Sequence, residues 1–182
     1  RHDFVYRGDA PLVDTYVGFQ LDPDVGFSGD DYIGSYPEQD LVMAYNGSDV
    51  DSFYGPSPPA SGLRVLRGPS ERPLSRSIDP SRSPSSLLEF FCFEEGVRGP
   101  AYYRNFQGLH CDGVPQSYGG EGYNPGASSF STHAFPGLPP SYWSQVNTDG
   151  AGRRARPADV RILASPGPFD MLPGETYTVD TA

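Results

Sequence analysis

Glycine and proline interrupt this chain so often that no stretch of it carries the apolar periodicity of a long helix. The 182 residues include 22 glycines and 20 prolines, which disfavour helix interiors and mark turns. The same chain holds 11 Phe, 12 Tyr and 1 Trp, and aromatic side chains supply a large apolar area for a core. The composition therefore predicts an all-β fold, a loop-rich β-sandwich with at most one short helix, in a single domain of residues 1–182.

Strands are expected where apolar residues alternate with polar or small ones. In residues 15–21 this alternation places Val17, Phe19 and Leu21 on one face, as in a half-buried strand. Residues 68–86 are rich in Ser, Pro and Arg and contain no aromatic residue, so we expect a surface insertion there. The other expected strands are 40–45, 63–67, 87–93, 128–135, 160–164 and 175–179, and the expected helix is 101–109.

Acidic residues are concentrated near the start of the chain. Between Asp14 and Asp51 there are nine Asp or Glu residues and no Arg, Lys or His, in a chain whose net charge is −10. Crowded carboxylates repel one another unless a cation lies among them, and calcium accepts many oxygen ligands in flexible geometry. The alternative is an acidic loop that is merely solvated. The predicted calcium ligands are Asp22, Asp24, Asp30, Asp31, Asp49 and Asp51.

The overall charge and the apolar runs exclude two classes of partner. Because nucleic-acid binding needs a basic face, an acidic chain with a pI near 4.5 argues against it. No apolar run is long enough to span a bilayer, so we expect no membrane insertion. The chain begins at Arg1 without a leader, and we interpret it as a mature or trimmed product.

Two cysteines, Cys92 and Cys111, are expected to form one disulfide in an exported protein, which would contribute about 3 kcal/mol in the chain-entropy model. The alternative is two buried thiols. Asn46 begins an N-x-S sequence, and the dipeptides Asp14-Thr15 and Asp51-Ser52 resemble O-glycan acceptor sites. These signals predict a glycoprotein only where a glycosylation system exists.

No catalytic group stands out in the sequence, and we predict that the protein is not an enzyme. His110-Cys111-Asp112 offers three zinc ligands in a row, but neighbouring residues of a strand point to opposite faces. A hydrolase remains an alternative if His133 or His110 pairs with a serine, although residues 126–130 lack the second glycine of the nucleophile elbow. Tyr118, Tyr123 and Trp143 lie beside small polar residues, as aromatic residues do in carbohydrate-binding surfaces; alternatively they pin loops to the sandwich.

Four segments resemble, in order, parts of large secreted proteins of Bacteroidetes-type bacteria: residues 15–36, 44–55, 103–123 and 161–175. Those proteins usually carry a C-terminal sorting signal for export to the cell surface and are mostly uncharacterised. The resemblance implies an exported, surface-associated, β-rich protein in which the aspartate loop is the cation site.

Together these observations predict a secreted or cell-surface structural protein that calcium stabilises. Its expected partner is itself, in a homo-oligomer that could extend into an extracellular filament. The alternative function is a carbohydrate-binding module of a secreted protein, with glycans as partners and Trp143, Tyr118 and Tyr123 as the stacking residues.

Overall fold

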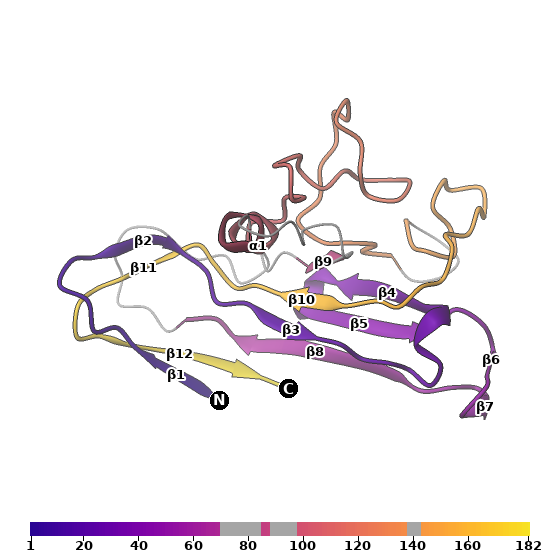
Figure 1. Cartoon of the computed structure of the whole chain (residues 1–182), viewed down its shortest axis with the longest axis horizontal. Coiled ribbons are helices and arrows are strands. Elements are labelled where there is room, and N and C mark those ends of the chain that lie inside the picture. Colours follow the sequence, from indigo (N-terminus) through magenta and orange to yellow (C-terminus); the bar gives the residue numbers. More distant parts are fainter. Residues whose placement is uncertain (70–84, 88–97, 138–142) are drawn as a thin grey trace.

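The computed structural model describes residues 1–69, 85–87, 98–137 and 143–182, and antiparallel sheets dominate it (Figure 1). The strands are β1 His2–Val5, β2 Leu12–Thr15, β3 Phe19–Leu21, β4 Asp31–Tyr36, β5 Leu41–Asn46, β6 Val50–Asp51, β7 Gly55–Pro56, β8 Ala60–Arg67, β9 Ser85–Leu87, β10 Ile162–Ala164, β11 Phe169–Met171 and β12 Thr176–Thr181. The helix α1 spans Arg98–Phe106, and two short 3-10 helices, η1 and η2, span Ser28–Asp30 and Pro37–Gln39. The predicted all-β, loop-rich fold is confirmed.

Two sheets form the centre of the molecule. A five-stranded sheet has the order β1-β12-β8-β5-β4, and a three-stranded sheet has the order β3-β10-β9. Strand β10 packs on β5 and β8, so apolar side chains from both sheets meet in one core. The central members of this core are Ile33, Ala44, Val65, Ile162 and Val179. Burying an aliphatic side chain of this size contributes about 2 kcal/mol.

The strand predicted at 15–21 is broken in the middle. Strand β2 ends at Thr15 and β3 begins at Phe19, and between them the Val17 nitrogen donates to the Pro166 carbonyl at 3.2 Å. A side chain at Gly18 would collide with Phe106 of α1, because its Cβ would lie 2.3 Å from a ring carbon. The break therefore lets the helix approach the sheet closely.

Three other expectations need correction. The helix begins at Arg98 and ends at Phe106, three residues earlier than predicted. Residues 128–135 form no strand, although Phe130 makes an isolated bridge there, to Ser117. Residues 70–84 of the predicted insertion and 88–93 of the predicted strand lie outside the described residues. The last two residues of that insertion, 85 and 86, begin β9 and pair with β10.

Strand β4, which the sequence analysis left inside the acidic region, is a covered edge of the larger sheet. Its three outward N–H groups all have partners that lie outside regular strands. Asp31 N donates to the Ala158 carbonyl at 3.2 Å, and Ser35 N donates to the Phe135 carbonyl at 3.2 Å. Ile33 N donates to the side-chain oxygen of Gln145. A covered edge of this kind cannot pair with a further strand.

Among the helices of the described residues, none combines the length and the apolar character that a membrane-spanning helix needs.

Candidate functional site

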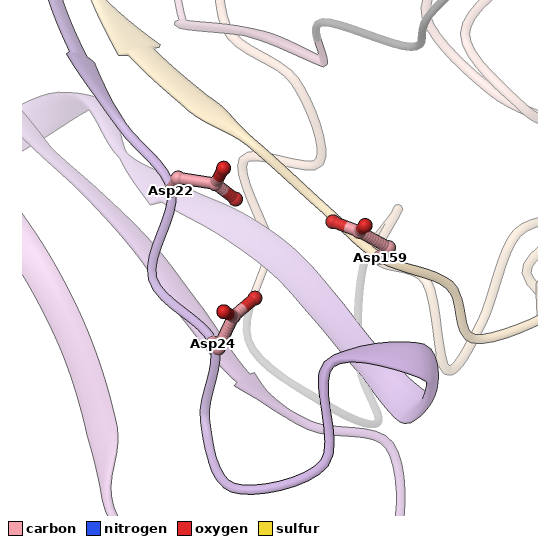
Figure 2. A group of neighbouring side chains, drawn as sticks. All are labelled: Asp22, Asp24 and Asp159. Atoms are coloured by element: carbon pink, nitrogen blue, oxygen red, sulfur yellow. The ribbon is translucent and has the colours of Figure 1, made fainter.

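The six aspartates predicted to bind calcium do not come together in one place. Among the described residues, only Asp22 and Asp24 of this set belong to a group in which three carboxylates can reach one ion, and the third member is Asp159. One oxygen from each lies within 4.8 Å of the others, and all three side chains are exposed. Figure 2 shows the carboxylates pointing into the space between the segment after β3 and the segment before β10. We call these three residues the aspartate cluster.

The pairing of β3 with β10 explains how the aspartate cluster forms. The last pair of this ladder joins Leu21 to Ile162, and the ladder thereby brings the segment after β3, with Asp22 and Asp24, beside the segment before β10, with Asp159. The Arg161 guanidinium lies 2.9 Å from an Asp22 oxygen and 3.2 Å from an Asp159 oxygen. Arginine thus offsets part of the charge. The carboxylates still repel one another, because like charges held this close are destabilising.

The aspartate cluster offers oxygen donors only. Carboxylate oxygens are the ligands that hard cations such as calcium prefer, whereas softer metals prefer thiolate or imidazole. Water would have to complete the coordination because the three side chains are exposed. Sequence analysis missed Asp159 because this residue is far from the acidic region along the chain. Only the register of β3 against β10 could have revealed it.

Asp51, at the end of β6, is buried, and its carboxylate ties two loops together. One oxygen accepts a hydrogen bond from Phe27 N at 3.0 Å, and the other accepts from Phe53 N and Tyr54 N at 2.7 Å each. These backbone bonds, with that from Phe27 the strongest cause, lower the pKa of Asp51. Gly26 permits the approach: its φ is +80°, and a Cβ there would lie 2.1 Å from an Asp51 oxygen.

Asp31, the first residue of β4, is 1 % exposed, and its carboxylate is only half satisfied. One oxygen accepts a hydrogen bond from Val25 N at 3.0 Å. The other oxygen has no partner among the described residues. Burial raises the pKa of Asp31 to about 6, and the neighbouring carboxylates of Asp30, Asp24 and Asp51 add to this rise.

Two more buried oxygens at this corner lack partners within the described part of the chain, one from Asn46 and one from Asp30. Asn46 faces Asp31 in the β4–β5 register. Its amide nitrogen donates to the carbonyls of Ser48 at 3.0 Å and Val50 at 3.3 Å, which fixes the amide orientation and leaves the oxygen as the unsatisfied atom. Among the described residues, the unsatisfied oxygens of Asp31, Asn46 and Asp30 have no hydrogen-bond donor. Either a proton on Asp31 or a bound cation would supply a partner.

Asp49, the remaining predicted ligand, is exposed in the turn before β6. Its main-chain oxygen accepts a hydrogen bond from Ser57 N at 2.9 Å, and its side chain is not part of the aspartate cluster. The predicted set therefore falls into separate groups. Within the described part of the chain, only Asp22 and Asp24 of this set lie in a group of three carboxylates that could hold an ion.

Trp143, predicted to stack on a sugar, is instead a core residue that is 4 % exposed. Its ring centroid lies 4.9 Å from that of Tyr118 and 5.0 Å from that of Phe135, and its nitrogen donates to the Gly120 carbonyl at 2.9 Å. A ring packed in this way cannot stack on a ligand. Tyr118 and Tyr123 are about half exposed.

Within the triplet His110-Cys111-Asp112, the side chains of His110 and Asp112 form hydrogen bonds within their own loop. His110 Nε2 lies 2.9 Å from the Gly122 carbonyl. Asp112 accepts hydrogen bonds from Val114 N at 2.9 Å and from the Tyr123 hydroxyl at 2.7 Å, and these bonds, led by that from Val114, lower the pKa of Asp112. The triplet does not converge on one point, as expected from its spacing.

Cys111 is disulfide-bonded in the structure. Cys92, the only other cysteine of the chain, lies outside the described residues. The predicted pairing of these two cysteines stays a prediction.

His133 is buried, and burial lowers its pKa to about 4. Its Nδ1 lies 3.1 Å from the Thr132 hydroxyl. The Ser131 hydroxyl donates to the main-chain oxygen of His133 at 2.7 Å rather than to its imidazole. This serine and histidine therefore do not form the nucleophile and base pair that the hydrolase alternative needs.

Comparison of the chain with protein-family models, with curated proteins and with solved structures gives no match.

Proposed function

We propose that this chain is a structural domain of the cell surface in which calcium binds the aspartate cluster. The single observation that carries the proposal is that Asp22, Asp24 and Asp159 each bring one carboxylate oxygen within 4.8 Å of the others. An ion there would connect the exit of β3 to the entry of β10 and would remove the repulsion between these carboxylates. The disulfide at Cys111 supports an oxidising, extracellular location.

Thermal unfolding in the presence and absence of calcium tests this proposal. Protein stripped with a chelator should gain about 8 °C in Tm when calcium reaches a hundred times its dissociation constant, because the ion binds only the folded state. Asp159→Asn should abolish the gain. The matched control is Asp49→Asn, which removes the same charge from an exposed position outside the cluster. A Tm that calcium at millimolar concentration leaves unchanged would refute the proposal.

Self-association is the second part of the proposed role. A homo-oligomer or filament should appear in sedimentation equilibrium or electron microscopy of the calcium-loaded protein. A strictly monomeric species at high protein concentration would remove this part and leave the calcium site standing.

Carbohydrate binding is the second candidate function, and the half-exposed rings of Tyr118 and Tyr123 favour it. The Tyr123 hydroxyl is fixed on Asp112 at 2.7 Å, so its ring is held in place before any ligand arrives. A glycan array with the unchanged protein and with Tyr123→Ala tests this candidate. Trp143 is no longer among the proposed stacking residues.

A further inference from the structure

One end of the molecule exposes large apolar side chains although a core is available to bury them. The side chains of Phe27, Val50, Phe53 and Tyr54 are 52 %, 59 %, 75 % and 59 % exposed. They belong to the loop before η1 and to the β6–β7 hairpin, which lies at the end of the molecule opposite β2 and β11 (Figure 1). We call these four residues the aromatic end. Exposed apolar residues gathered in one place mark interaction surfaces.

The aromatic end is held in shape by one buried group. The backbone nitrogens of Phe27, Phe53 and Tyr54 all lie within 3.0 Å of an oxygen of the Asp51 carboxylate. The three aromatic residues therefore start from fixed and neighbouring points on the backbone. A surface fixed before binding loses less conformational entropy when a partner arrives.

The segments that build the aromatic end are acidic, although Asp22 pairs with Arg161 of a neighbouring segment and Asp31 and Asp51 are buried. The two segments that build it, residues 22–31 and 46–57, contain six aspartates and no Arg, Lys or His. Asp24 and Asp49 are exposed. A partner with negative charge would be repelled, and a partner with positive charge would be attracted.

We propose that the aromatic end binds an arginine-rich segment of another polypeptide. A guanidinium group stacks on aromatic rings and pairs with carboxylates through the same planar group, so it matches both components of this surface. A lysine ammonium is more strongly hydrated and stacks less well. The proposal does not depend on the calcium site.

Two other occupants fit the surface less well. Two copies of the chain that met through this end would bring their acidic loops together across a twofold axis, and like charges would oppose the contact. An anionic lipid surface would be repelled for the same reason.

Peptide titration tests the proposal. Fluorescein-labelled nona-arginine, nona-lysine and nona-glutamate are titrated with the protein in chelator, and binding is followed by fluorescence anisotropy. We expect nona-arginine to bind more tightly than nona-lysine, and nona-glutamate not to bind. The double variant Phe53→Ser with Tyr54→Ser keeps the charge of the protein and should weaken nona-arginine binding about tenfold. The matched control is Phe130→Ser, which removes an equally exposed ring (55 %) from the loops after α1.

Three results would overturn the proposal. Equal affinity of the double variant and the unchanged protein for nona-arginine would mean that the peptide is held by general attraction to an acidic surface. A dimer that the double variant loses in sedimentation equilibrium would assign the aromatic end to a second copy of the chain. Binding to neutral phosphatidylcholine vesicles that depends on Phe53 would assign it to a lipid surface. Circular dichroism of both variants checks that they are folded.

Discussion

Two regions of the molecule contain little regular strand. One is the acidic end, residues 22–31 and 46–57, and the other is the set of loops in residues 107–137. Different interactions stabilise the two regions. At the acidic end, backbone N–H groups donate to the buried carboxylates of Asp31 and Asp51. In the loops after α1, backbone N–H groups donate mainly to backbone carbonyls, and the loops close on the buried ring of Trp143.

A glycine-rich chain is thus ordered in two ways: by buried carboxylates at the acidic end, and by backbone hydrogen bonds and aromatic packing in the loops after α1. Carboxylate anchors depend on ionisation, so the stability that they contribute depends on pH. Neutral backbone bonds and aromatic packing do not titrate between pH 4 and 8. Substitutions in the two regions should therefore differ in their response to pH, and the following predictions test the anchors of each region.

The largest effect is expected at Trp143. Trp143→Ala removes a buried ring that contacts Tyr118 and Phe135, and such truncations cost about 4 kcal/mol. Thermal denaturation should give a Tm about 12 °C lower, by a similar amount at pH 5 and pH 8. If the loss in Tm changed strongly with pH, the assignment of this region to neutral packing would be wrong.

The next largest effect is expected at Asp51. Asp51→Asn replaces one of the two carboxylate oxygens that accept backbone N–H groups with an NH2 group that can only donate, so at least one of Phe27, Phe53 or Tyr54 loses its acceptor. The Tm at pH 7 should fall by about 8 °C. Asp49→Asn is the control, because its side chain is exposed. A Tm within a degree of that of the control would show that the loops hold without this anchor.

The smallest effect, and the one with opposite sign, is expected at Asp31. The pKa of Asp31 in the folded protein is about 6, above its ordinary value of 3.8, so its contribution to stability is complete below pH 3.8 and is lost as pH rises through 6. Asp31→Asn should therefore stabilise the protein at pH 8, by at most about 3 kcal/mol, and should have little effect at pH 4. Chemical denaturation across this range measures the difference.

His133 provides the internal check on this pH dependence. Burial lowers its pKa from 6.5 to about 4, so its contribution to stability is complete above pH 6.5 and is lost as pH falls towards 4. In the Asp31→Asn variant, stability should therefore rise with pH between 4 and 6.5. If the stability of this variant instead falls as pH rises from 4 to 6.5, Asp31 is not the group whose ionisation lowers the stability of the unchanged protein in this range.

The sequence predicted strands where apolar and polar residues alternate. It did not predict β4, a strand that is buried on both faces. The strands predicted at 40–45 and 63–67 correspond to β5 and β8. Strand β4 carries Gly34 and Ser35 and is buried along most of its length, so it shows no alternation. At the break between β2 and β3, Phe106 of α1 lies too close to Gly18 for any side chain there, a contact that local patterns cannot express.

The candidate site was predictable only in part, for a related reason. Composition identified the acidic region and with it Asp22 and Asp24, but crowding along the chain says nothing about which carboxylates face each other. At Asp51, backbone N–H groups rather than a cation stabilise the carboxylate. These donors are brought together by the fold, and the sequence does not predict them. Asp159 entered the site through strand pairing.

The covered edge at β4 restricts how copies of this molecule can join by adding strand to strand. In the described part of the chain, the opposite edge of the larger sheet is β1, which pairs with β12 alone. One open edge allows two molecules to align back to back, and the resulting pair has no open edge left on that sheet for a third. Continuous growth of a fibre could therefore not proceed by strand addition to this sheet.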